Sequence, residues 1–482
     1  MSSPTISLPF SRHAVAMLVA TTLPLAAYAA EADPDARIRQ LEQMMQQMAQ
    51  QRAEQDKQMQ VMAEELKAMQ QQMAQGKEND LKERGKSTGA PVLANFKDGV
   101  SFEDGSGNWQ LAINGRIQAD ARAFDPDESA ADTFSVRRAR LGATMTFYKD
   151  YVVRVEGEYS GNSTSMTYGY FDFNKFKQAK IRLGQFKPFY GLERSMSTNF
   201  TDFQERSMAD ALLGGTYDRG VMVHGAPLSG LYYSAAYING NSSDESDVEY
   251  DNKDLTARLT GNIAQFAGWK DAVVHLGGFY AYGKQEGRSA IPTFQTEARG
   301  YKFFETSDTT ANKFTDPVER TRDGIELALA KGPVKLQSEY IRADFDGQGF
   351  DREMSAWYAS VNWLVSGESF ASAYKDGAFG RIRPKNDFKS GGNGWGALQL
   401  GIRYSSFDGD DFVTSNTAGE GKLAANKTNE ADAWTLGANW ILNPNVRLIA
   451  NYVHTRFDDA VTVSGKNYDD EDALSMRAQF DF

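Results

Sequence analysis

The chain ends in the stretch LSMRAQFDF (residues 474–482), in which apolar and polar residues alternate. Side chains of an extended strand point to its two faces in turn, so residues of one parity share a face. One face of this stretch is therefore wholly apolar, and the other carries Ser475, Arg477, Gln479 and Asp481. A strand that is apolar on one face and charged on the other is typical of a barrel wall between lipid and water.

The same two-residue period recurs along the chain. Sixteen such runs lie near residues 109–124, 134–148, 150–160, 165–174, 179–186, 217–225, 229–239, 253–264, 270–283, 322–331, 333–343, 353–366, 395–408, 430–442, 444–457 and 472–482. A soluble sandwich would bury its apolar faces and leave few long strands so heavily charged opposite them. We therefore predict an all-β membrane protein, a closed barrel of sixteen antiparallel transmembrane strands around an aqueous channel.

The connections between these runs alternate in length. Tight turns are expected at residues 149–150, 227–229, 331–333 and 443–445, and acidic or glycine-rich loops at residues 125–132, 240–252, 284–320, 409–429 and 458–471. Short periplasmic turns and long external loops are typical of outer-membrane barrels. Residues 367–394 are an exception, because they form a long loop on the side of the turns.

Three segments precede the predicted barrel domain of residues 101–482. Residues 1–29 resemble a signal peptide, with Arg12 and His13 before an apolar run and small residues at Ala27 and Ala29. Residues 36–75 place apolar residues at alternating steps of three and four, which predicts a periplasmic coiled-coil helix. A disordered glutamine-rich linker is the alternative. Residues 76–100 contain glycine and proline and are predicted to be a linker.

Composition bears on function chiefly by exclusion. The formal net charge of −12 argues against binding of nucleic acid, and the absence of cysteine excludes a disulfide framework. After the leader only His224, His275 and His454 remain, and none lies near a recognisable nucleophile motif. We therefore predict that the protein is not an enzyme. No metal-binding or phosphate-loop motif is present in the sequence, so neither a metal nor a cofactor is expected.

The barrel region, from about residue 95 to 482, resembles the phosphate-selective porin O and P family of Gram-negative outer membranes. The resemblance rests on INGRIQADARAF, FSVRRARLGATMTFYKDY, IRLGQFKPFYGLERSMS, FQERSMADAL, VVHLGGFYAYG, WYASVNWLVSGE, LQLGIRYSSFDGDD and WTLGANWILNPNVRLIANYVH, which follow in this order. It implies a homotrimeric anion channel in the outer membrane, surrounded by lipid and lipopolysaccharide. It also implies that the third external loop folds inward and narrows the pore.

The same resemblance assigns candidate residues to the constriction. Residues 187–216 are the expected inward loop, and a loop of this length is usually functional. Arg194 and Arg206 in this loop match basic positions of the family. Three further basic positions and one acidic position match Arg116, Arg137, Arg138 and Asp172. Together these residues are expected to form a path for small anions.

One departure from the family leaves the substrate open. Phosphate-specific members line one external entrance with an arginine ladder, whereas residues 284–320 hold only Arg288, Arg299 and Arg320 with a few lysines. Phosphate, pyrophosphate, another anion or a poorly selective pore all fit the sequence. The alternative function is a general porin that also tethers the envelope, with residues 36–75 contacting peptidoglycan or another periplasmic partner.

Overall fold

The computed structural model describes residues 92–95, 99–128, 130–240, 253–285, 291–306, 317–347, 350–389, 391–413 and 422–482, together with Met45, Gln46, Lys57, Gln60 and Glu64. The chain divides into two units, residues 1–86 and 87–482. In the first unit the five isolated residues are helical and exposed. The predicted signal peptide, the remainder of the predicted coiled coil and most of the predicted linker lie outside the described residues.

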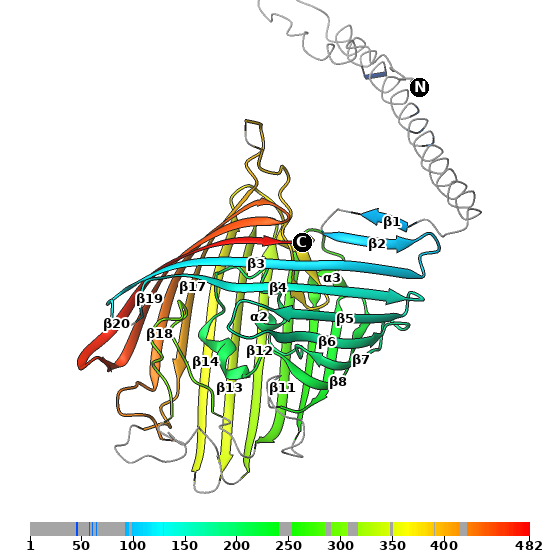
Figure 1. Ribbon diagram of the computed structural model, residues 1–482. Coiled ribbons are helices and arrows are strands. Elements are labelled where there is room, and N and C mark those ends of the chain that lie inside the picture. The colour runs from blue at the N-terminus through cyan, green and yellow to red at the C-terminus, as the bar shows by residue number, and fades with distance from the viewer. Residues whose placement is uncertain are drawn as a thin grey trace, which may run out of the picture. The chain divides into compact units, whose positions relative to one another are not determined.

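The second unit is a closed antiparallel barrel (Figure 1). Its sixteen strands are β3 (Trp109–Asp125), β4 (Thr133–Phe147), β5 (Tyr151–Glu158), β6 (Ser165–Phe173), β7 (Lys180–Phe186), β8 (Asp218–Leu228), β9 (Leu231–Ile238), β10 (Asp254–Asn262), β11 (Ala272–Gln285), β12 (Val318–Lys331), β13 (Val334–Gly347), β14 (Phe350–Leu364), β17 (Ala397–Asp408), β18 (Glu430–Asn443), β19 (Val446–Val463) and β20 (Lys466–Asp481). Each strand pairs with its neighbours in sequence, and β20 closes the barrel on β3, where Asp481 pairs with Arg116. The predicted strand number and closure are confirmed.

The wall has its polar face inside and its apolar face outside. In β20, Ser475, Arg477, Gln479 and Asp481 are at most 3% exposed, whereas Leu474, Met476 and Phe480 are 48%, 52% and 46% exposed. This distribution is the reverse of that in a soluble protein, and it suits a wall with lipid outside. Among the helices in the described part of the chain, none has the length and apolar character needed to cross a membrane.

A short hairpin precedes the barrel and extends its sheet. β1 (Val92–Asn95) pairs with β2 (Val100–Asp104), and β2 pairs with residues 110–113 of β3 (Figure 1). β20 pairs with β3 only as far as Arg116, so residues 110–113 of β3 would have no partner on that edge. β2 supplies that partner. The hairpin was not predicted, since residues 92–95 fall in the expected linker and show no long alternating run.

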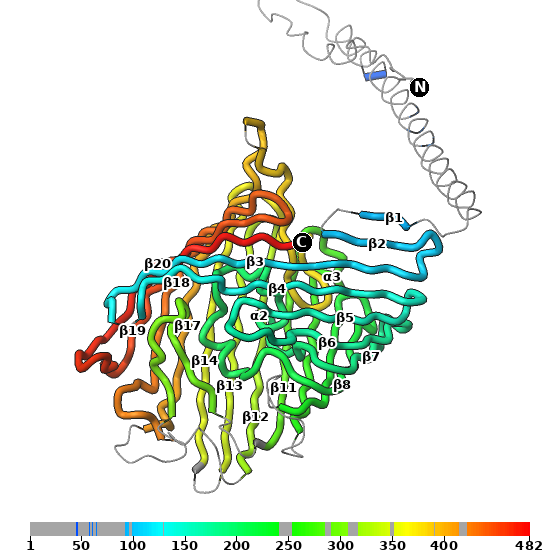
Figure 2. Tube along the Cα trace, in the orientation of Figure 1, coloured from blue at the N-terminus to red at the C-terminus, as the bar shows by residue number. Residues whose placement is uncertain are grey.

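Two connections fold into the lumen. Residues 187–217, here called the inner loop, join β7 to β8 and contain α2 (Leu192–Ser195) and the 3₁₀ helix η1 (Met208–Leu213). Residues 365–396, here called the turn-side loop, join β14 to β17 and contain η2 (Phe370–Ala373), β15 (Tyr374–Lys375) and β16 (Ala378–Phe379). Apolar side chains of the two loops pack together, with Leu192 and Met196 in one cluster with Phe370 and Phe379. Figure 2 shows α2 between the two ends of the barrel strands rather than beyond them.

The remaining elements fit the same plan. α3 (Ile263–Phe266) forms the connection between β10 and β11. Residues 291–306, from the external loop between β11 and β12, pack Phe294, Phe303 and Phe304 against the inner loop and the surrounding strands. The lumen is therefore filled in part by three inserted segments, and the long turn-side exception in the sequence is one of them.

Candidate functional site

The inner loop is fastened to the wall around the barrel. Its backbone carbonyls accept hydrogen bonds from side chains of seven strands: Gln118 (β3), Ser234 (β9), Arg322 (β12), Arg403 (β17), Asn439 (β18), Arg447 (β19) and Gln479 (β20). Its backbone also donates hydrogen bonds to the wall. The N–H groups of Leu192 and Glu193 donate to the carboxylate of Glu339 in β13, at 2.5 and 2.8 Å. The wall therefore fixes the position of every functional group that this loop carries.

A cavity of about 290 Å³ lies between the inner loop and the first strands of the barrel. Six cationic side chains line it: Arg116, Arg137, Arg138, Arg140, Lys187 and Arg206. Among the described residues, Glu158 is the one carboxylate of this lining, and Thr198 and Tyr217 contribute hydroxyl groups. We call this space the basic cavity.

A β-bulge brings two adjacent arginines into the basic cavity. In the β3–β4 pair, Gln118 lies opposite Arg138 and Ala119 lies opposite Val136, so Arg137 is an extra residue without a partner in β3. A bulge of this kind reverses the inward and outward order of side chains beyond it. Leu141, which follows the bulge in sequence, and Val136, which precedes it, are both exposed on the outer face. One has an odd and the other an even number, so the order of side chains changes at the bulge. Arg137 and Arg138 can therefore both face the lumen.

Two glutamates, the buried Glu156 and the partly buried Glu205, bridge these cations. Glu205 of the inner loop lies 3.0 Å from Arg137, 3.6 Å from Arg138 and 2.7 Å from Arg477. Glu156 of β5 lies 3.8 Å from Arg116 and 2.7 Å from Arg154 in the same way. Burial would raise the pKa of the Glu205 carboxyl, but the surrounding guanidinium groups, Arg137 first, hold that pKa well below its usual value. Glu205 is therefore ionised and acts as a fixed counter-charge.

Positive charge nevertheless exceeds negative charge in this network. Its ten cations are Arg116, Arg122, Arg137, Arg138, Arg140, Arg154, Lys187, Arg194, Arg206 and Arg477, and its five carboxylates are Asp120, Glu156, Glu158, Glu205 and Asp210. Lys187 shows the effect, because burial and then the neighbouring Arg206 and Arg194 lower the pKa of its ammonium well below the usual value. Its Nζ donates to the carbonyls of Ser195 and Met196, at 3.3 and 2.9 Å. An anion in the cavity would relieve this excess.

Comparison with known proteins fits this architecture. The family model described as phosphate-selective porin O and P matches residues 111–482. The chain belongs to this family. The porin is 27% identical to Porin O of Pseudomonas aeruginosa over 428 residues, which cover 82% of this chain and 93% of that protein. It is 24% identical to an uncharacterized protein of Caulobacter vibrioides, over 76% of this chain and 72% of the other. Its location is the outer membrane of a Gram-negative bacterium.

Solved structures with a similar fold are more distant. The trimer form of OmpT from Vibrio cholerae superposes with a TM-score of 0.49 at 11% identity, over 78% of the porin and 99% of OmpT. An anion-selective porin from Comamonas acidovorans superposes with a TM-score of 0.46 at 12% identity, over 78% of the porin and the whole of that chain. With TM-scores below 0.5 and identities near 12%, the two structures carry no conclusion about the function of this porin.

The porin brings four of the six predicted site residues together. Arg116, Arg137, Arg138 and Arg206 line the basic cavity. Arg194 is 2% exposed and does not line it, because its Nε and Nη2 donate to the Asp210 carboxylate at 2.6 and 3.0 Å. Its Nη1 donates to the carbonyls of Gly214 and Gly215, both at 3.1 Å. These contacts fold the inner loop on itself.

Asp172 also lies apart from the basic cavity. Its two carboxylate oxygens accept hydrogen bonds from Nε and Nη2 of Arg182 at 2.7 and 2.8 Å. The Arg182 guanidinium in turn lies 3.9 Å from the centre of the Tyr170 ring. Asp172 therefore has a cation of its own, and the carboxylates paired with the predicted arginines are Glu156, Glu205 and Asp210.

Several residues of the site were missed from the sequence. Arg140 follows Arg138 at the same parity in VRRAR, and Lys187 lies in QFKPFY, so both had a readable signal. Glu205 lies in FQERSM, but nothing in the sequence shows that it meets arginines of β3, β4 and β20. Arg299, from the external loop between β11 and β12, lies close enough to these arginines to feel their positive charge. Burial and then Arg137 lower the pKa of its guanidinium to about 10.

Proposed function

We propose that the porin forms a water-filled, anion-preferring channel, with the basic cavity as its selectivity filter. The observation that carries this proposal is the lining itself, in which six cations face one carboxylate. The inner loop forms one side of the cavity, and the hydrogen bonds to the wall hold it there. A small anion passing the constriction would therefore meet fixed positive groups.

Electrostatic magnitudes support a preference for anions without tight trapping. A cation about 4 Å from an anion contributes about 1 kcal/mol in bulk water and about 4 kcal/mol at an effective dielectric of about 20. Several arginines in a narrow space would add to this, and a well that is too deep would stop conduction. Glu156 and Glu205 make the well shallower, since each lies among at least three of the arginines.

The chemistry of the lining favours oxyanions such as phosphate, pyrophosphate or a related anion. Arginine presents a planar fork that matches two oxygens of such a group, whereas lysine offers a point charge. Thr198 and Tyr217 place hydroxyl groups beside Arg116 and Arg140, at 2.6 and 2.5 Å. The name of the family, phosphate-selective porin O and P, agrees with this substrate class. A homotrimer embedded in lipid and lipopolysaccharide is proposed on the family resemblance.

The second candidate is a poorly selective general porin that also tethers the envelope. It depends on residues 36–75, which lie almost entirely outside the described part of the chain. Conductance after deletion of this segment separates the two roles, because a pore keeps its conductance whereas a tether loses its attachment to the envelope.

The deciding experiment is the reversal potential of the purified porin in planar bilayers under a KCl gradient. Anion preference is expected for the wild type. The double variant Arg116→Glu with Arg138→Glu should lose or reverse it, while Arg342→Glu, a change at a more exposed arginine of β13, should not. A wild-type channel that prefers K⁺ would refute the proposal.

A further inference from the structure

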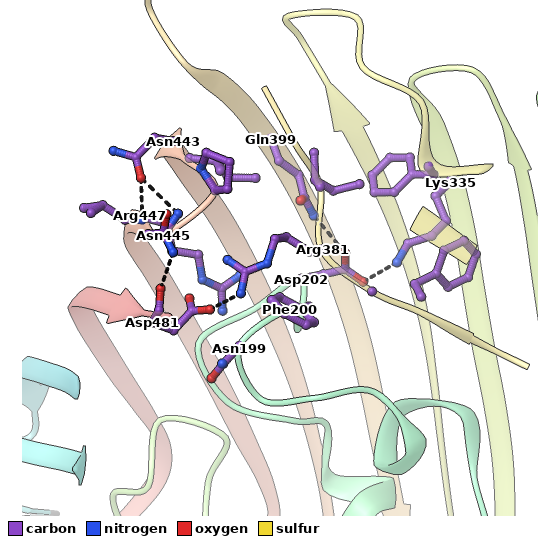
Figure 3. Close-up of a pocket in the computed structure, with 17 residues that line it drawn as sticks. Asn199, Phe200, Asp202, Lys335, Arg381, Gln399, Asn443, Asn445, Arg447 and Asp481 are labelled. Atoms are coloured by element: carbon purple, nitrogen blue, oxygen red, sulfur yellow. Dashed lines mark hydrogen bonds and ion pairs between the residues drawn. The ribbon is translucent and has the colours of Figure 1, made fainter. Parts of the chain in front are cut away.

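A second, smaller cavity lies at the turn end of the barrel, away from the basic cavity. Its volume is about 30 Å³, and three segments enclose it (Figure 3). Residues 199, 200 and 202 of the inner loop form one side, Phe370, Phe379 and Arg381 of the turn-side loop form another, and residues 443–445 close it between β18 and β19. It shares no lining residue with the basic cavity.

Arg447 of β19 lines this cavity and is short of hydrogen-bond partners. The residue is 7% exposed, and its Nη1 donates to the carbonyl of Thr201 at 3.1 Å. Its Nε and Nη2 have no acceptor among the residues that the structure describes. A guanidinium carries five N–H donors, and leaving buried donors of a charged group unpaired is costly. The site therefore calls for an acceptor.

The carboxylates of the cavity are already engaged with other cations. Asp202 accepts from the Lys335 ammonium at 2.6 Å, and Asp481 forms an ion pair with Arg381. Three cations, Lys335, Arg381 and Arg447, thus face two carboxylates in the lining. One positive charge remains without a counter-charge in a buried position, where an unpaired ion is strongly destabilising.

The size of the cavity limits what can supply that charge. Its volume of about 30 Å³ is roughly two to three times the ~10–15 Å³ that one water molecule needs. A phosphate ion, with four oxygens around its phosphorus, is too large, whereas a monatomic anion fits. Figure 3 shows the three enclosing segments meeting around Arg447, Arg381 and Asp481.

We propose that this cavity is a binding site for one halide ion, held by Nε and Nη2 of Arg447. The ion supplies the missing negative charge and ties the inner loop and the turn-side loop to the wall at β19. It is a resident ion rather than cargo, because the cavity accommodates one small anion and lies apart from the basic cavity. The proposal does not depend on which anion the channel transports.

The first test is crystallographic. Crystals of the full-length porin grown with bromide in place of chloride should show an anomalous scattering peak within hydrogen-bonding reach of Arg447 Nε and Nη2. The peak should be absent in Arg447→Met. If the wild type has no peak in this cavity, or if the peak persists in Arg447→Met, the proposal is wrong, and water or another group satisfies the arginine.

The second test uses the stability of the porin in detergent. An ion that binds only the folded state stabilises it, so the unfolding midpoint rises as the concentration of the ion is increased. The midpoint should therefore be several degrees higher in sodium chloride than in sodium gluconate at equal ionic strength. Arg447→Met should lose this difference and Arg342→Met, the matched control, should keep it. Equal midpoints of the wild type in the two salts would overturn the proposal, as would an unchanged difference in Arg447→Met.

Discussion

Arg137 and Arg138 are adjacent in β4, yet both side chains line the same cavity, because Arg137 is the extra residue of a β-bulge. In a regular strand one of the two would point into lipid. The bulge therefore does two things at once. It supplies a second arginine to the basic cavity and it reverses the order of side chains in the outer part of β4.

Deleting Arg137 tests what the bulge is needed for. Gln118 would still lie opposite Arg138 and Ala119 opposite Val136, so the pairing becomes regular while Phe134 and Val136 stay on the outer wall. We expect the folded barrel to persist, measured as the fast-migrating band before boiling, with a lower anion preference because the basic cavity loses one arginine. Arg137→Ala removes the same charge but keeps the extra residue, and should give the same two results. Loss of the folded band on deletion alone would show that the bulge itself is needed for folding.

Arg194 and Arg206 should respond differently to the same substitution. Arg206→Glu places a carboxylate in the lining of the basic cavity, so the reversal potential should move toward cation preference. Arg194→Glu instead places a buried carboxylate against Asp210, and breaking a buried pair costs about 3–5 kcal/mol. Its main effect should be a lower unfolding midpoint. A folded Arg194→Glu channel with reversed selectivity would return Arg194 to the filter.

Glu205 is expected to limit anion preference. Glu205→Gln removes a counter-charge shared by Arg137, Arg138 and Arg477, so the permeability ratio of anion to cation should rise. Stability should fall at the same time, since the arginines lose their buried partner. Bilayer reversal potentials and thermal unfolding measure the two effects. Glu353→Gln, at a more exposed position of β14, is the control that should change neither quantity.

The pH dependence of selectivity should come from Lys187. Its pKa is lowered well below 10.5, so its charge is lost at a lower pH than in an ordinary lysine. Anion preference should therefore fall as the pH rises through this lowered pKa. The unfolded chain keeps the proton up to about pH 10.5, so the stability of the folded porin should rise with pH in the same window.

Reversal potentials recorded over a pH series up to about pH 10.5 measure this step. Lys187→Met should abolish it and show a lower anion preference at pH values below the step, where the wild-type lysine is charged. A step of the same size in Lys187→Met would assign the titration to another group.

The strands could be read from the sequence because their signal is local. Each run alternates over eight or more residues, and lipid outside with water inside makes both faces informative, as in LSMRAQFDF. The hairpin of β1 and β2 lacked this signal, since β1 has four residues, all exposed. Its place depends instead on where β20 ends, which is a property of the closed barrel.

The site was predictable only in part, for a related reason. Basic residues at inward positions of β3 and β4 follow from alternation and resemblance, and three of them, Arg116, Arg137 and Arg138, do meet. Pairings within and across the inner loop do not follow, because they depend on how that loop folds. Arg194 and Asp210 are sixteen residues apart, and Glu205 meets Arg477 across most of the chain. No periodicity encodes such contacts.

The inner loop is hydrogen-bonded to strands on all sides of the barrel, from β3 to β20. A lid that swings would have to break many of these bonds together, so this constriction has no hinge on which to open. The porin would then work as a fixed sieve without a gate. Its flux would follow the solute concentration outside, and a cell could adjust uptake only through the number of copies that it makes.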